Sequence, residues 1–148
     1  MEADRQLERT SAGYFWLRQP QVAECVSETI REGAQVRSLY ELVAFVVMPN
    51  HVHLLINPGA TAPKITQFVK GVSAKRANEL LRRTGHRFWQ DESFDHWVRS
   101  PKERDSIIRY IDERISHPRL TYFGIRALSQ ASQTKVCATS NIKLSKRH

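Results

Sequence analysis

The spacing of hydrophobic residues along the chain changes twice within its first half. Over residues 20–32 apolar side chains recur at helical spacing, and Gly33 is suited to end the helix. Residues 39–48 are almost continuously apolar and rich in valine, which indicates a strand covered on both faces. Residues 48–50 (Met-Pro-Asn) then predict a tight turn, so residues 51–57 return as the antiparallel partner of a hairpin.

The pattern then predicts a long helix, a short strand and a final helix. An apolar stripe runs through residues 64–83, where we expect the best-defined helix of the chain. Over residues 94–99, Phe94, His96 and Val98 alternate with Asp95, Trp97 and Arg99, which indicates a short strand. Ser100 before Pro101 is a strong helix start, and we expect that helix to run to about Ser116.

From Thr121 onward the periodicity ends. The sequence has 148 residues, which predicts one domain over residues 1–120 and a tail over residues 121–148. The tail contains five Lys or Arg residues and no acidic residue, with many Ser, Thr and Ala. We therefore expect it to be flexible and able to contact phosphates without sequence specificity.

Composition and charge narrow the class of partner. Hydrophobic content is 41%, no apolar stretch is long enough to span a membrane, and no signal peptide is recognisable. Cys25 and Cys137 are two isolated cysteines, which fits a reducing, cytoplasmic setting without a membrane partner. The net charge of +8 favours a polyanionic partner, nucleic acid first, although a basic surface can also serve solubility alone.

Two histidines interrupt the second strand of the hairpin. Because a strand points alternate residues to opposite faces, His51 and His53 project from the same side, and Val52, Leu54 and Ile56 face the other way. The two imidazoles could be a packing feature, or they could be metal ligands that need a third partner.

Tyr110 is the second candidate for a functional residue. On the final helix it falls outside the apolar arc formed by four isoleucines, at positions 107, 108, 111 and 115. A tyrosine at this place can simply cover the edge of the core. It can also act as a phenolic nucleophile that attacks a phosphodiester and forms a covalent phosphotyrosine.

Three segments carry a family resemblance: MPNHVHLLI (48–56), FWQDESFDHWVRSPKER (88–104) and IIRYIDE (107–113). Together they resemble the single-tyrosine HUH transposases, and more narrowly the REP-associated tyrosine transposases, over about residues 12–113. The resemblance implies an α+β fold, with a ferredoxin-like antiparallel sheet flanked by helices. It also implies metal-dependent cleavage and strand transfer on single-stranded or hairpin DNA, through a 5′-phosphotyrosine intermediate.

The same resemblance assigns roles to individual residues. It maps the metal-binding histidines onto His51 and His53, with Mg²⁺ or Mn²⁺ as the cofactor, and the nucleophile onto Tyr110. A homodimer is possible, as in the wider superfamily. Basic side chains of the long helix and the residues after it are expected to contact the DNA backbone: Lys64, Lys70, Lys75, Arg76, Arg82, Arg83 and Arg87.

Two departures from the family pattern lead to alternative hypotheses about the function. Arg114 stands where relatives have a polar residue that can assist the metal, and arginine cannot coordinate a cation. Glu113 or His117 could substitute, and the C-terminus diverges after Glu113. The first strand of the family also has no counterpart here, which predicts unpaired backbone groups beside the histidine strand. A catalytically impaired DNA-binding remnant is therefore the alternative function, and a phosphoesterase that uses the histidine pair alone is a third.

Overall fold

The computed structural model describes the backbone of residues 16–89, 93–116, 123–126, 135–139 and 142–147, and side chains within residues 16–89 and 97–116. Its elements follow the predicted order of helices and strands, with three further strands near the C-terminus. They are a 3₁₀ turn η1 (Trp16–Arg18), α2 (Pro20–Gln35), β1 (Tyr40–Val47), β2 (Val52–Pro58), α3 (Ala62–Leu80), β3 (Ser93–Val98), α4 (Pro101–Ile115), β4 (Phe123–Arg126), β5 (Lys135–Thr139) and β6 (Ile142–Arg147).

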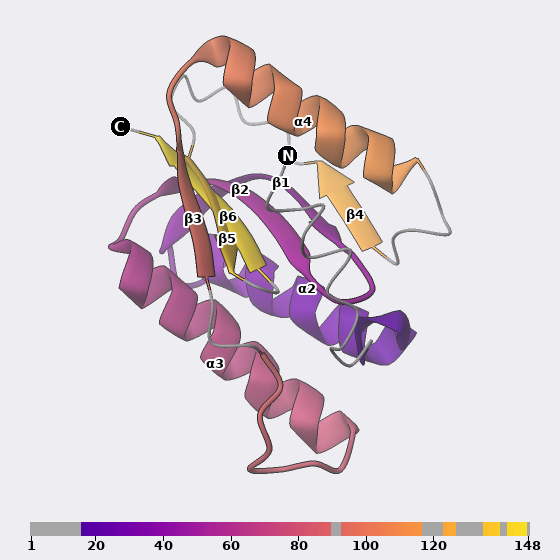
Figure 1. The fold of residues 1–148 in the computed structure, drawn as a ribbon. Coiled ribbons are helices and arrows are strands. Elements are labelled where there is room, and N and C mark those ends of the chain that lie inside the picture. The colour runs from indigo at the N-terminus through magenta and orange to yellow at the C-terminus, as the bar shows by residue number, and fades with distance from the viewer. Residues whose placement is uncertain (1–15, 90–92, 117–122, 127–134, 140–141, 148) are drawn as a thin grey trace.

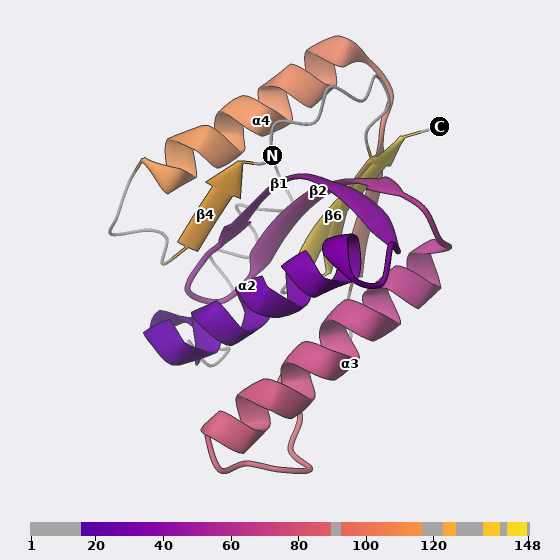
Figure 2. The same cartoon turned by 180° about the vertical axis from the view of Figure 1, so that it is seen from behind.

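A six-stranded sheet lies between two layers of helix, with α4 on one face and α2 and α3 on the other (Figures 1 and 2). The strand order is β3-β5-β6-β2-β1-β4. The β1–β2 hairpin is antiparallel and most other pairings are too, whereas β6 runs parallel to both β2 and β3. The predicted α+β class, an antiparallel sheet flanked by helices, is confirmed.

Strand alternation in the hairpin divides the core into two clusters. Phe45, Val47, Val52, Leu54 and Ile56 pack with α2 and α3. The intervening positions pack with α4, where Ile107 and Ile111 are buried: Ala44, Val46 and Leu55. Each strand is therefore apolar on both faces, which explains the continuous apolar run in its sequence.

One polar contact within α4 and two between α2 and α3 fix these helices. In α4 the Ser100 side chain accepts a hydrogen bond from the Glu103 backbone N–H at 3.1 Å, as the Ser-Pro pair predicted. Between α2 and α3, Arg76 donates to a Glu32 carboxylate oxygen at 2.7 Å and to the Thr29 hydroxyl at 3.2 Å. The hydrogen bond from Arg76 to the Glu32 carboxylate is the main cause of the lowered pKa of Glu32.

The C-terminal segment differs from the sequence-based expectation. No regular element was expected after Thr121, yet β4 pairs with β1 and both β5 and β6 pair with β2. The prediction of unpaired backbone groups along β2 is therefore wrong over Val52–Ile56. The division into a domain and a flexible tail over 121–148 stays a prediction, and much of that tail lies outside the described residues.

No helix among the described residues is long and apolar enough to cross a membrane.

Candidate functional site

The two histidines stand at the start of β2, directly after the hairpin turn. The Met48 backbone N–H donates to the His51 carbonyl at 2.8 Å, which closes the turn. Val52 and Leu54 face the α2 and α3 layer, so His51 and His53 face α4, as their spacing predicted. Both side chains are buried, with exposed fractions of 0% and 2%. Burial on this face removes the imidazoles from bulk water.

The ring nitrogens of the pair converge on one point. The Nε2 atoms of His51 and His53 are 3.1 Å apart, and the ring planes meet at 74°. The Nδ1 atom of His51 lies 2.7 Å from the Asn50 side-chain oxygen, which accepts only if Nδ1 carries the proton. Asn50 thus leaves the Nε2 lone pair of His51 directed at the point that both histidines share.

This arrangement fits one divalent cation. Two nitrogen ligands on adjacent coordination positions, each about 2.1 Å from an ion, lie about 3 Å apart. The separation of 3.1 Å between the Nε2 atoms matches that value. Within the described residues no group of three His, Cys, Asp or Glu side chains gathers to hold a metal. His51 and His53 can therefore supply two ligands, and a bound substrate or water would have to supply others.

Tyr110 lies beside this pair. Its ring centroid is 5.1 Å from that of His53, with an interplanar angle of 65°. The ring is half-buried, and in the described part of the chain the buried hydroxyl oxygen has no hydrogen-bond partner. Ile107 and Ile111 are buried on the same helix and hold it against the sheet. The structure thus brings together three residues that the sequence separates by nearly sixty positions.

Arg114 also contacts the tyrosine. Its guanidinium carbon lies 4.7 Å from the Tyr110 ring centroid, one helical turn further along α4. The position where the resemblance predicts a polar residue is therefore next to the nucleophile candidate and holds a fixed positive charge. Glu113, which could substitute for Arg114 as a metal ligand, is exposed, and His117 lies outside the described residues.

A pocket of about 360 Å³ borders Tyr110. Two carboxylates and one guanidinium surround it, so its charge is mixed. It is lined by Glu103, Ser106, Ile107, Arg109, Tyr110 and Glu113. Ser106 and Arg109 were not singled out from the sequence, and neither was Asn50. The role of Asn50 could have been predicted from the sequence, because a side-chain amide directly before a histidine in a turn can orient the imidazole ring.

The seven basic residues proposed to bind DNA do not surround Tyr110. Most lie on α3, which covers the opposite face of the sheet from α4 (Figure 2). Arg76 is engaged with Glu32, and Arg83 lies over the Trp16 ring at 4.6 Å. Four of the seven are exposed: Lys64, Lys75, Arg82 and Arg87. Lys70 is half-buried, as Arg76 and Arg83 are.

The fold and this site define an α+β protein with two buried histidines and a half-buried tyrosine on one face of its sheet. The family described as "Transposase IS200 like" matches residues 11–114, and the chain belongs to this transposase family. DNA is therefore its class of partner, and transposase-type cleavage of DNA its class of reaction. No curated protein and no solved structure matches the chain. The narrower resemblance to REP-associated transposases stays a prediction.

Proposed function

We propose that the protein cleaves single-stranded or hairpin DNA and transfers the cleaved strand through a covalent 5′-phosphotyrosine at Tyr110. The observation that carries this proposal is the 5.1 Å contact between the Tyr110 and His53 rings, beside the two converging Nε2 atoms. A nucleophile and a pair of metal ligands on one face of one sheet are the parts that a tyrosine-dependent phosphoryl transfer needs.

In each step of the proposed reaction, one phosphorus–oxygen ester bond breaks and another forms. The Tyr110 oxygen loses its proton and attacks the scissile phosphorus, the phosphorus–O3′ bond breaks, and the 3′ oxygen leaves and takes up a proton. The 5′ phosphate is then held as a tyrosine ester. In the second step the 3′ hydroxyl of another strand attacks this phosphorus and releases the tyrosine. Because bond types are exchanged one for one, neither step needs a nucleotide cofactor.

Other residues have separate proposed roles in metal binding, ring orientation and DNA contact. His51 and His53 would hold Mg²⁺ or Mn²⁺, which supplies charge neutralisation at the scissile phosphate when bound. Imidazole ligands favour Mn²⁺ over Mg²⁺ of these two ions. Asn50 fixes the ring orientation of His51. The exposed cations of α3, on the other face, contact parts of the DNA backbone distant from the cleaved bond.

A second candidate function rests on Arg114. A guanidinium 4.7 Å from the Tyr110 ring cannot ligate a metal, and the described residues offer no third protein ligand. Under this alternative the chain is a DNA-binding remnant whose cleavage is impaired, and binding then needs no cation. The main proposal, in contrast, also includes a REP-type hairpin as the DNA target and a homodimer as the active form.

The test is covalent capture of DNA. The protein is incubated with Mn²⁺ and an end-labelled hairpin that has single-stranded flanks, and a denaturing gel shows whether labelled DNA migrates with protein. We expect a band that disappears with chelator and with Tyr110→Phe, which removes only the hydroxyl oxygen. If folded protein binds the hairpin without forming the band, while Arg114→Gln forms it, the remnant is the correct alternative. A band that persists in Tyr110→Phe would refute the assignment of the nucleophile.

A further inference from the structure

The Tyr110 ring is in contact with a cation as well as with the histidine pair. The Arg114 guanidinium carbon lies 4.7 Å from the ring centroid, and the His53 ring centroid lies 5.1 Å from it. Helical side chains point back toward the N-terminus, so a residue at position 114 directs its side chain onto Tyr110, one turn earlier. Arg114 is half-buried, three residues after the buried Ile111. The helix therefore holds the guanidinium beside the nucleophile candidate.

Arg109 also borders Tyr110, but its surroundings differ from those of Arg114. It is exposed, and it lines the 360 Å³ pocket together with Glu103 and Glu113, whose carboxylates offset its charge. Water and salt screen an exposed charge much more than a partly buried one. The half-buried Arg114 is therefore the cation with the stronger effect at Tyr110, and Arg109 supplies a matched comparison on the same helix.

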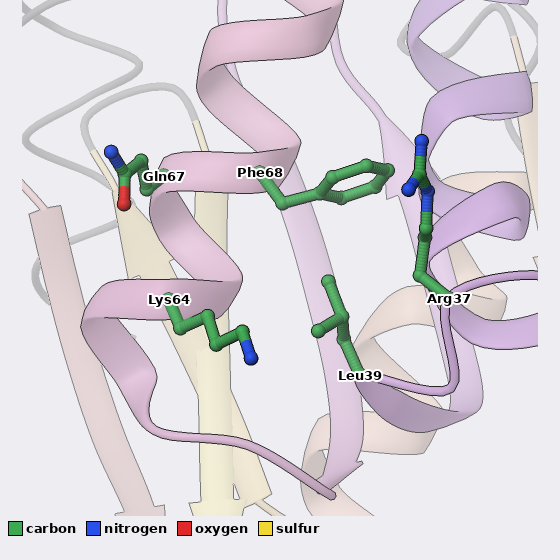
Figure 3. A pocket seen from close by; sticks show the side chains of 5 residues that line it. All are labelled: Arg37, Leu39, Lys64, Gln67 and Phe68. Atoms are coloured by element: carbon green, nitrogen blue, oxygen red, sulfur yellow. The ribbon is translucent and has the colours of Figure 1, made fainter.

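A second arginine with an aromatic contact lies on the other side of the sheet, at a pocket of about 420 Å³ between α3 and the turn that joins α2 to β1. Figure 3 shows Phe68 extending from α3 toward Arg37. The Arg37 guanidinium carbon lies 5.7 Å from the Phe68 ring centroid. Arg37 therefore resembles Arg114 in its contact but is remote from Tyr110. The residues lining this pocket are Arg37, Leu39, Lys64, Gln67 and Phe68.

The proposed reaction brings negative charge to the place where Arg114 lies. Once Tyr110 has lost its proton, its oxygen and the scissile phosphodiester together carry two negative charges, which repel each other. A fixed cation already in position stabilises such a charge distribution without reorganisation of the site. Arginine suits this task because its planar guanidinium is always charged and can donate two parallel hydrogen bonds to two phosphate oxygens. The same properties prevent it from binding a metal ion.

We propose that Arg114 is a catalytic residue that binds the non-bridging oxygens of the scissile phosphate during attack by Tyr110. The proposal rests on the proposed cleavage through Tyr110 and deepens it by assigning the group that offsets the charge on the phosphate. Arginine at this position then acts on the substrate, where the resemblance predicts a residue that acts on the metal. Its effect is opposite in sign to that in the remnant alternative, in which the same guanidinium impairs cleavage.

The first test measures how fast the covalent band forms with Mn²⁺ and the labelled hairpin, when protein is in excess over DNA. Arg114→Gln should slow this step about 100-fold, and Arg114→Lys should recover part of the loss because it restores the charge without the planar donors. Arg109→Gln and Arg37→Gln, which remove the same charge elsewhere, should each change the rate by about threefold or less. Circular dichroism checks that every variant is folded. A rate for Arg114→Gln equal to or above that of the wild type would overturn the proposal.

The second test separates contact with the phosphate from a purely structural role of Arg114. In a hairpin with a methylphosphonate at the cleaved position, a methyl group replaces one non-bridging oxygen, so the scissile linkage is uncharged. Arg114 then has no negative charge to offset. The rate ratio between wild type and Arg114→Gln should therefore fall from about 100 to about three. An equal loss on the charged and the uncharged hairpin would mean that Arg114 only supports the fold around Tyr110, and would overturn the proposal.

A binding measurement assigns a failure to its cause. Tyr110→Phe, with chelator present throughout, should bind the phosphodiester hairpin about tenfold more tightly than the methylphosphonate hairpin, and adding Arg114→Gln should abolish this preference. A covalent band in the wild type whose rate does not depend on Arg114 leaves the proposed function standing and refutes this inference. Preference for the charged linkage without a band from any variant refutes the proposed cleavage and leaves Arg114 as a phosphate-binding residue. Absence of both refutes both.

Discussion

Gly33 and Gly71 are both helical glycines, and the structure predicts opposite effects when each is replaced by alanine. At Gly33 an added methyl carbon would lie 2.8 and 2.9 Å from two Tyr40 side-chain carbons, and closer still to the hydroxyl oxygen. Carbon atoms in contact normally lie about 3.5–4.0 Å apart. At Gly71 the same methyl group meets nothing within 4 Å.

The magnitude at Gly33 follows from three opposing effects. Alanine is favoured over glycine inside a helix by about 1 kcal/mol. Overpacking of a core costs about 1–3 kcal/mol. Tyr40 is 3% exposed and its hydroxyl donates to the Ile30 carbonyl at 2.6 Å, so displacement of the ring leaves a buried polar group unpaired. That loss costs a further 1–3 kcal/mol or so. We expect Gly33→Ala to be destabilised by about 2 kcal/mol and Gly71→Ala to be stabilised by up to about 1 kcal/mol.

The assay is urea denaturation of the wild type and both variants, followed by circular dichroism at 222 nm. The difference in unfolding free energy between the two alanine variants should be about 3 kcal/mol, the sum of the two effects. Equal stability of Gly33→Ala and Gly71→Ala would refute the contact between Tyr40 and Gly33.

Three other predictions concern polar contacts. Asn50→Ala should lower Mn²⁺ affinity by about 10–100-fold in calorimetric titration, because His51 loses the group that orients it; unchanged affinity would contradict this. Glu32 has a pKa lowered from 4.5 by its hydrogen bond from Arg76, so its stabilising contribution is present above pH 4.5 and is lost as the pH falls further. Glu32→Gln should therefore show a weaker fall in melting temperature below pH 4.5, and an unaltered profile would exclude this pair as the cause. Ser100→Ala should cost about 1 kcal/mol in urea denaturation, and no loss would show that the side-chain cap is dispensable.

The sequence predicted those parts of the fold that depend on local periodicity. α2, the hairpin, α3 and α4 appear close to their expected bounds because their apolar positions recur at the spacing of a helix or a buried strand. The shared face of His51 and His53 also followed from alternation alone. Their proximity to Tyr110 did not, since periodicity says nothing about which helix covers which face. The resemblance to a family suggested it, and the 5.1 Å ring contact agrees with it.

Other features depend on contacts that are remote in sequence. α3 was expected to hold the DNA because it is basic, yet Arg76 is engaged with Glu32 of α2. Strands β5 and β6 were missed because their patterns are short: β5 has one run of three apolar residues, and β6 alternates only over Ile142–Ser145. Strand pairing itself uses backbone groups that every residue possesses. The pocket between Arg37 and Phe68 was missed for a similar reason: its residues come from a turn and a helix that only the folded chain brings together.

Strand alternation around the histidines also limits which changes in chain length this family member can tolerate. A substitution at Val52 alters one contact, whereas insertion or deletion of a single residue between His51 and His53 changes the parity of one histidine relative to the other. At least one imidazole would then face the α2 and α3 layer while an apolar side chain replaced it beside Tyr110. Comparisons of natural variants should therefore find the number of residues between this turn and the end of β2 held as strictly as the histidines themselves.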